Sequence, residues 1–144
     1  MIKWLKLFIT TLPFIYMILI WVLSSLPHDA VIELPSGTFD RFLKESLHLI
    51  EFGILHFLFI AALLVHGKLN VATHTLAAVF AAFYGFTDEI HQAFVPYRSA
   101  TMIDAVKDVI GVLIVYLVVQ RFYFVKRDSG LRKLFVRVEG YFQV

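Results

Sequence analysis

Residues 85–111 read G-F-T-D-E-I-H-Q-A-F-V-P-Y-R-S-A-T-M-I-D-A-V-K-D-V-I-G, and both flanks of this run are hydrophobic enough to cross a membrane. Between the two apolar segments, the run places a dense set of polar side chains. They are four carboxylates (Asp88, Glu89, Asp104, Asp108), an imidazole (His91), an amide (Gln92) and a guanidinium (Arg98). Because charge at a membrane boundary or deeper is costly, a cluster this dense predicts a functional site.

The composition of the whole chain agrees with a membrane setting for this run. The chain has 144 residues, of which 60% are hydrophobic and 17% are charged. A soluble domain is nearer half apolar. We therefore predict an integral membrane protein, too small for more than one compact helical domain. The chain has no Cys, which excludes disulfides, thiolate metal sites and a Cys nucleophile.

Four apolar segments predict four membrane-spanning helices, at about residues 7–26, 47–65, 69–86 and 102–123. The first is interpreted as an uncleaved anchor and not as a signal peptide. Its 20 uncharged residues are too many for a signal peptide, and Ser24-Ser25-Leu26-Pro27 is a poor cleavage site. The short break at His66-Gly67-Lys68 makes the second and third spans antiparallel neighbours.

The distribution of Lys and Arg predicts the orientation of these spans. Nine basic residues fall at the N-terminus, the 66–70 turn and the tail, against three in the 27–46 and 87–101 loops. The expected fold is thus an all-α integral membrane bundle of four transmembrane helices with both termini cytoplasmic. We expect residues 1–125 to form this domain and residues 126–144 to form a basic amphipathic cytoplasmic tail.

The tail has apolar residues at helical spacing with basic residues between them. The apolar set is Leu131, Leu134, Phe135, Val138 and Phe142. This pattern favours a helix lying on the anionic lipids of the inner leaflet. The alternative is a frayed, solvated tail, because Gly130 and Gly140 weaken a helix.

Three predicted helix ends converge on the outward-facing side. If the third helix continues past its apolar part, Asp88 and Gln92 share a face, as do Asp104 and Asp108 in the fourth helix. The second span adds His48 and Glu51, with Lys44 one turn before. The expected site therefore comprises Lys44, His48, Glu51, Asp88, Glu89, Gln92, Arg98, Asp104 and Asp108. The alternative is a structural role, in which the acids are neutralised by Arg98, Lys107 or His48.

The remaining histidines are not expected to take part in the site. His56 on an apolar helix is expected to be a hydrogen-bonded packing residue, and His66 and His74 are expected on the cytoplasmic side without a role. His91 adjoins the cluster but is expected to point away from it. A hard divalent cation could use the carboxylates, and His48 could join for zinc, but the spacing does not demand a metal. No motif for nucleophilic catalysis occurs in the chain.

The run from Asp88 to Gly111 resembles the VanZ-like family of small bacterial membrane proteins. The resemblance implies a pattern of Asp-Glu, Gln, Phe-x-Pro-x-Arg, Asp, a second acid or amide, and Gly. Here these are Asp88, Glu89, Gln92, Phe94, Pro96, Arg98, Asp104, Asp108 and Gly111. An upstream element of a basic residue, His, Glu and an aromatic is matched by Lys44, His48, Glu51 and Phe52 in F-L-K-E-S-L-H-L-I-E-F-G-I-L. The resemblance covers about residues 39–112.

The chain departs from the family pattern at three positions. Tyr97 stands where Gly is usual before Arg98, Phe52 replaces the usual Tyr, and Glu45 stands where a second basic residue is common. The family is named for a member that raises resistance to the glycopeptide teicoplanin. The resemblance therefore implies a cell-envelope protein of the bacterial membrane and a phenotype class, but not a reaction.

The first functional hypothesis is binding. Arg98, with Lys44 behind it, would hold the phosphate or carboxylate of a membrane lipid or lipid-linked wall precursor, and the acids and His48 would position Arg98. Such a protein would lower the access of a glycopeptide to its target. The residues expected to bind are Arg98, Asp88, Gln92, Glu51, Asp108 and Lys44.

The alternative is a membrane enzyme acting on a lipid or lipid-linked envelope substrate. Glu89 or Asp104 would be the general base, His48 the proton partner, and Arg98 would stabilise negative charge. A proton-coupled carrier is disfavoured because the acids gather at one end and only His56 continues inward. Nucleic-acid binding has no support, since the basic residues sit in a short tail beside a membrane. Homo-oligomerisation and any cofactor are left open.

Overall fold

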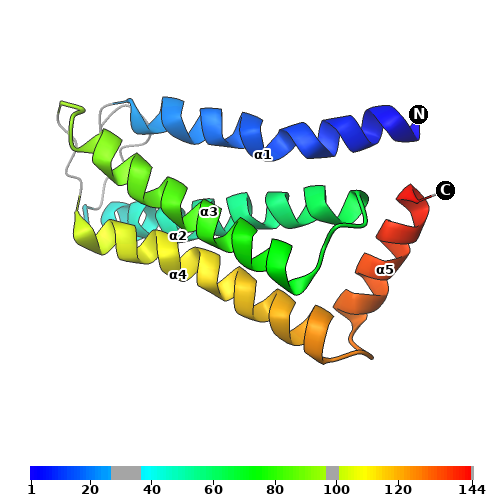
Figure 1. Ribbon diagram of the computed structural model, residues 1–144. Helices are drawn as coiled ribbons and strands as arrows, with labels where there is room; N and C mark the ends of the chain where they lie inside the picture. Colours follow the sequence, from blue (N-terminus) through cyan, green and yellow to red (C-terminus); the bar gives the residue numbers. More distant parts are fainter. Residues whose placement is uncertain (27–36, 97–100, 144) are drawn as a thin grey trace.

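The computed structural model describes residues 1–26, 37–96 and 101–143, with only the backbone of residues 37–48. Within these ranges, the chain is all-helical and has no strand (Figure 1). The elements are α1 (Ile2–Ser24), α2 (Gly37–Val65), α3 (Val71–Gln92), α4 (Met102–Val119), the π-helical segment η1 (Gln120–Val125) and α5 (Gly130–Phe142). The all-α prediction is confirmed for the described residues.

Three predicted helix boundaries were too narrow, because the apolar segments were used as the limits of the helices. α2 begins at Gly37, ten residues before the predicted start, so Lys44 and His48 lie on a helix and not in or next to a loop. α3 continues past Phe86 to Gln92, and α1 includes Lys3 and Lys6. Charged residues such as Lys and Glu are good helix formers, so a helix does not stop where an apolar segment stops.

α1 is the helix of the described chain whose length and apolar composition alone are sufficient to cross a membrane. Residues Leu49–Val65 of α2 form a shorter apolar helix. α4 is apolar over most of its length but carries Asp104, Lys107 and Asp108 within 18 residues. The sequence therefore marks α1 as a spanning helix more strongly than the other helices.

A tight turn joins α2 to α3 at residues 66–70. Gly67 has a φ of +63°, a left-handed conformation that favours glycine. Asn70 then caps α3: the backbone N–H of Thr73 donates to the Asn70 side chain (3.0 Å), and the Asn70 N–H donates to the Thr73 hydroxyl (3.0 Å). The predicted antiparallel pairing of the second and third helices is confirmed.

α2 packs most extensively against α4, and glycines on both helices permit the approach. A Cβ at Gly111 of α4 would collide with the carbonyl oxygen of Leu49 of α2. A Cβ at Gly53 of α2 would lie 3.3 Å from the Gly111 carbonyl oxygen. Small residues at helix contacts let two backbones come close, as is common in membrane bundles.

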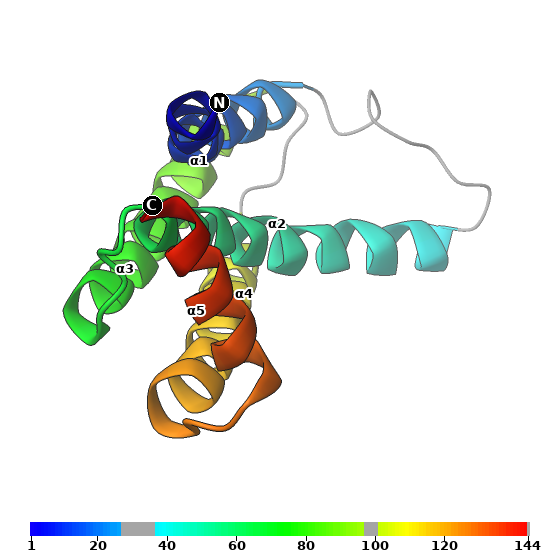
Figure 2. The same ribbon diagram turned by 90° about the vertical axis from the view of Figure 1, so that its right-hand side faces the viewer.

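The tail forms the helix α5, which crosses the end of the bundle (Figure 2). Ser129 caps it by accepting from the Arg132 N–H (3.0 Å), and the Arg132 guanidinium donates to the Tyr123 carbonyl (2.8 Å). Three members of its apolar face pack into a core with Ile60, Leu64, Val119 and Tyr123; they are Leu131, Phe135 and Val138. Much of this face therefore covers the bundle, and binding of the tail to anionic lipid stays a prediction.

The two ends of the molecule differ in the helix ends and polar residues that they carry. Figure 1 shows α1 and α3 ending, and α4 beginning, at one end, while the two chain termini and α5 lie at the other. The end where α3 stops and α4 starts carries Asp88, Glu89, Gln92 and Asp104. We call it the polar end.

Candidate functional site

The last turns of α3 hold three buried polar side chains. Asp88, Glu89 and Gln92 are 0%, 7% and 3% exposed. The Gln92 amide donates to the Asp88 carboxylate over 2.7 Å, which requires both residues to share a helix face. The expectation that α3 continues through this point is therefore confirmed, and Gln92 fixes the orientation of the Asp88 carboxylate.

Asp108 of α4 is fully buried against α3. A Cβ at Gly85 of α3 would lie 3.1 Å from the Asp108 Cβ, 3.4 Å from its Oδ2 and 3.5 Å from the Phe52 ring of α2. Gly85 therefore makes the space into which the Asp108 carboxylate fits. The three helices α2, α3 and α4 meet at this point, as the predicted convergence of helix ends required.

Asp104 lies in a different environment, because its hydrogen bonds stabilise the N-terminus of α4. The Thr101 hydroxyl donates to Asp104 Oδ2 (2.6 Å), the Asp104 N–H donates back to Thr101 (3.2 Å), and the Lys107 ammonium contacts Oδ1 at 3.0 Å. The Asp104 and Lys107 side chains are each about one-fifth exposed. This reciprocal cap and ion pair satisfy the N-terminus of α4. Asp104 and Asp108 therefore lie on the same face of α4, but Asp104 is partly exposed whereas Asp108 is fully buried.

Glu51 joins the group from α2 and is half-buried. It and Asp88 both lie within electrostatic range of the Tyr84 hydroxyl, and Glu51 also lies within range of Tyr16 on α1. Phe52 is fully buried in an apolar cluster with Ile20, Leu55, Ala81 and Val112.

Three expected site residues lie outside what the structure describes. Arg98 falls in residues 97–100, and the side chains of Lys44 and His48 belong to the part of α2 described by backbone alone. The structure thus brings together Glu51, Asp88, Gln92 and Asp108, with Glu89 and Asp104 nearby. The contacts of Arg98, Lys44 and His48 stay predictions.

His91 points away from the acids, as expected, and joins α3 to α1. Its ring stacks on Trp21 with centroids 3.8 Å apart and planes at 21°, and its Nε2 lies 2.9 Å from the Ser25 hydroxyl. The Ser25 hydroxyl donates its hydrogen to the Trp21 carbonyl (2.7 Å). Ser25 must therefore accept from His91, so His91 carries a proton on Nε2.

The same arrangement recurs nearer the other end of α1. The Thr10 hydroxyl donates to the Lys6 carbonyl (2.7 Å) and lies 2.9 Å from Nε2 of His66, in the α2–α3 turn. By the same reasoning, His66 donates to Thr10. His66, for which no particular role was expected, thus makes a hydrogen bond between helices: together these two imidazole–hydroxyl bonds join α1 to α3 and to the α2–α3 turn, in addition to the apolar packing of Ile20.

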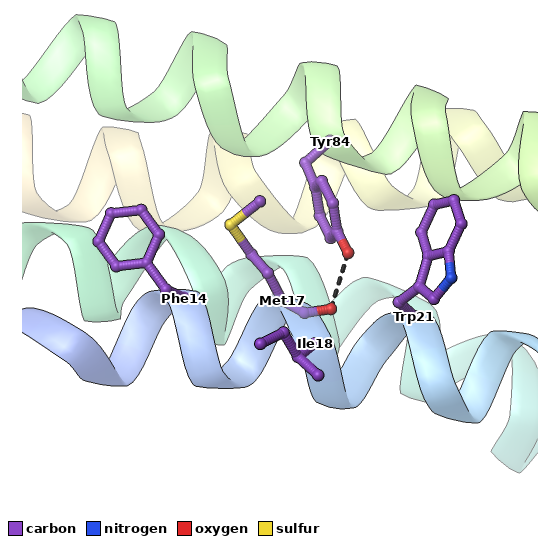
Figure 3. Close-up of a pocket in the computed structure, with 5 residues that line it drawn as sticks. All are labelled: Phe14, Met17, Ile18, Trp21 and Tyr84. Carbon is purple, nitrogen blue, oxygen red and sulfur yellow. Dashed lines mark hydrogen bonds between the residues drawn. The ribbon is translucent and has the colours of Figure 1, made fainter.

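Between these two attachments, α1 and α3 line an open groove of about 360 Å³ (Figure 3). Its lining is formed by Phe14, Met17, Ile18, Trp21 and Tyr84. The Tyr84 hydroxyl points toward α1 and donates to the Met17 carbonyl over 2.7 Å, so this polar atom is already hydrogen-bonded and the lining is otherwise apolar. Sequence reasoning missed this groove, because it depends on the spacing between two helices.

A second polar cluster, also missed, lies in the other half of the bundle. His56 and His74 are both fully buried, with ring centroids 5.2 Å apart, and His74 stacks on Tyr116 at 4.6 Å. His56 Nδ1 donates to the Val112 carbonyl (3.2 Å). His56 is therefore hydrogen-bonded as expected, but the expectation that His74 is unremarkable was wrong. Nothing in the sequence links two histidines 18 residues apart on antiparallel helices.

α4 and the start of η1 pass both polar clusters. Asp104, Asp108, Val112, Tyr116 and Gln120 recur every four residues, so each is a surface neighbour of the next and the row turns gradually around the helix. The row runs from the Thr101 cap, past the carboxylate beside Gly85, to the carbonyl bonded by His56 and the ring stacked on His74. Gly111, which contacts Leu49 of α2, lies between Asp108 and Val112 in the sequence.

Among the described residues, no three His, Asp or Glu side chains form a group suited to hold a metal ion. Metal binding through His48 and the acids stays untested, since that side chain is not described. The described arrangement can orient carboxylates, pair them with nearby cations and present Glu51, Asp104 and Lys107 toward the surface.

In a comparison with protein families, the model of the VanZ/LLP1 family matches residues 8–124 of the chain. The match spans α1 to α4 and most of η1, and it contains every expected site residue. Comparisons with curated proteins and with solved structures find no match.

Proposed function

The chain belongs to the VanZ/LLP1 family, and from this premise we propose that it is a multi-pass cell-envelope protein that binds a lipid or a lipid-linked wall precursor at the outer leaflet. Binding would lower the access of teicoplanin-type glycopeptides to their target. The observation that carries this proposal is the burial of Asp88 and Asp108 at the meeting point of three helices whose outer faces are apolar.

The distribution of polar and apolar side chains supports four membrane-crossing helices. Large apolar residues are exposed on α1, α2, α3 and α4, for example Ile18, Phe57, Phe83 and Leu117. Several ionisable side chains are buried instead, namely His56, His74, Asp88, Glu89 and Asp108. A soluble protein rarely exposes such continuous apolar surface, whereas a membrane bundle turns apolar faces to lipid and ionisable groups inward.

The proposed topology places both termini in the cytoplasm. The termini, the α2–α3 turn and α5 share one end of the molecule (Figure 1). Nine Lys and Arg residues lie at that end in the sequence count, against three in the 27–46 and 87–101 segments. Because an excess of basic residues is usual on the cytoplasmic side of a membrane, this count supports a polar end at the outer leaflet.

At that depth, the polar end is suited to a lipid headgroup. Asp88 and Asp108 are fully buried, so their role in this proposal is to position neighbouring groups. Arg98 and Lys44 would bind the phosphate or carboxylate of the headgroup, since a guanidinium binds such groups in a bidentate manner. Glu51 and Asp104, which are partly exposed, would contact amine or hydroxyl groups.

Binding is favoured over turnover by the state of the expected bases. Of the two expected bases, Asp104 already accepts hydrogen bonds on both oxygens, from Thr101 and Lys107, and Glu89 is buried in α3. Beside it, one oxygen of the expected binding residue Asp88 accepts from Gln92. These contacts hold the carboxylates in place as parts of the helix ends. No described contact favours a reaction, so we propose no catalytic step.

The first test is teicoplanin susceptibility in a sensitive Gram-positive host that expresses wild type, Glu89→Gln, Arg98→Ala or the exposed neighbour control Ile90→Val at matched membrane levels. We expect protection by wild type and the control, and its loss in the other two variants. Unchanged susceptibility with wild type would remove the resistance function while leaving the fold intact.

The second test measures lipid retained by purified protein. Wild type should retain more anionic envelope lipid than Arg98→Ala, with Ile90→Val equal to wild type. Equal retention by all three proteins would count against headgroup binding through Arg98.

A further inference from the structure

The groove between α1 and α3 adjoins the polar end, and two of its lining residues belong to both. Trp21 lines the groove and stacks on His91, which lies in the same helical turn as Asp88, Glu89 and Gln92. Tyr84 lines the groove and lies within electrostatic range of Asp88 and Glu51. The apolar groove therefore lies along α1, facing Tyr84 of α3 (Figure 3).

The groove is open to the surface along its length. Its volume of about 360 Å³ is at the lower end of the range of about 300–1,000 Å³ that is usual for small-molecule sites. Tyr84 is one helical turn before Asp88, a rise of about 6 Å along α3. A molecule whose polar group lies at the surface of the polar end would thus have its first apolar atoms beside Tyr84 and Trp21.

α1 is attached to the bundle on both sides of this groove and within it. Hydrogen bonds join it at Thr10 and at Ser25, and between them Tyr84 bonds the Met17 carbonyl. Phe14, Met17 and Ile18 line the groove between these bonds.

We propose that this groove binds one hydrocarbon chain of the lipid whose headgroup is held at the polar end. The proposal rests on the proposed function and adds the part of the ligand that the acids and Arg98 cannot recognise. The chain lies along Phe14, Met17 and Ile18, and the Trp21 and Tyr84 rings mark the level at which the headgroup begins. The Trp21 ring suits this boundary, because it has an apolar body and a polar tip.

The two tryptophans of the chain allow a direct test. Trp21 lines the groove, whereas Trp4 is exposed near the other end of α1. The variant Trp4→Phe leaves Trp21 as the only fluorophore, and Trp21→Phe leaves Trp4. Both full-length proteins are reconstituted in phosphatidylcholine vesicles that contain increasing fractions of phosphatidylglycerol with brominated chains, which quench tryptophan on contact.

A bound chain predicts that Trp21 loses fluorescence at lower fractions of brominated lipid than Trp4, and that its loss saturates. Adding Ile18→Phe to the Trp21 protein should fill the groove and reduce the early loss. Leu19→Phe, at an exposed neighbouring position outside the groove, should leave it unchanged. If Trp21 follows the bulk lipid fraction as Trp4 does, the groove holds only exchanging bilayer lipid and the proposal is overturned.

A second arm separates this proposal from headgroup binding. Brominated phosphatidylcholine replaces phosphatidylglycerol in the same vesicles. Early quenching of Trp21 by both lipids would retain the chain site and remove headgroup selectivity. Quenching of Trp21 at low fractions of brominated phosphatidylglycerol, but not of brominated phosphatidylcholine, would support both the chain site and headgroup binding. Self-association through α1 would instead lower Trp21 quenching as protein density rises, and would count against the chain site.

Discussion

Gly111 of α4 lies directly against the backbone carbonyl of Leu49 of α2, so close that a single added carbon at Gly111 would collide with it. This contact sets the distance between the two helices. It also places Gly53 against the Gly111 carbonyl and brings α4 to a position where Asp108 faces Gly85. The buried acid site therefore depends on glycines that carry no charge themselves.

The variant Gly111→Ala should be strongly destabilised, because backbone atoms must move to admit the methyl group. Overpacking of this kind costs about 1–3 kcal/mol, occasionally more. The midpoint of thermal unfolding in detergent measures the change. Gly140→Ala is the matched control: a Cβ there meets nothing within 4 Å, and replacing glycine inside a helix gains up to about 1 kcal/mol. Equal midpoints for both variants would contradict the close contact.

The bond between Gln92 and Asp88 should stabilise α3 only as a pair. Gln92→Leu removes the amide that donates to a buried carboxylate, and leaving that carboxylate oxygen without this donor should cost about 1–3 kcal/mol. The double variant Asp88→Leu/Gln92→Leu should recover part of the loss, since both polar groups are then gone. Thr87→Val serves as control, because its hydroxyl bonds only the Phe83 carbonyl within α3. If the thermal midpoint of the double variant falls by the sum of the losses of Asp88→Leu and Gln92→Leu alone, the two residues are not coupled.

The His56–His74 pair allows packing and polar roles to be separated. His74→Phe keeps a ring stacked on Tyr116 and removes two buried ring nitrogens that have no hydrogen-bond partner among the described residues. It should therefore be close to neutral for stability, whereas His74→Ala should cost about 2 kcal/mol or more through the cavity it leaves. Unfolding in detergent measures both. A large loss of stability in His74→Phe would mean that these nitrogens bond an internal water or another group.

The attachments of α1 should be detectable one at a time. Thr10→Val removes the acceptor for His66, and Ser25→Ala removes the acceptor for His91. Each change should cost about 0.5–1.5 kcal/mol and raise amide hydrogen exchange at the adjoining end of α1. Thr11→Val is the control beside Thr10, because its hydroxyl bonds only the Phe8 carbonyl of the same helix. If amide exchange rises as much in Thr11→Val as in Thr10→Val, the bond between Thr10 and His66 does not stabilise this end of α1.

Much of the local structure followed from the sequence, for reasons that operate within one helix. The apolar segments predicted α1 to α4, and the spacing of Asp88 and Gln92 predicted their shared face, which their hydrogen bond confirms. The helical spacing of the tail predicted α5. The boundaries were less accurate, since Lys and Arg end an apolar segment without ending a helix.

The sequence by itself determined which residues are apolar, which faces they share and that the acids gather at one end of the helices. Only the tertiary structure decided that Asp88 and Asp108 are buried, that His74 lies on Tyr116 beside His56, that the apolar face of α5 covers the bundle, and that α1 and α3 leave a groove. The physical reason is that a helix fixes its own periodicity, whereas the register and distance between helices arise from contacts such as Gly111 with Leu49. These contacts join residues far apart in the chain, and no single segment encodes them.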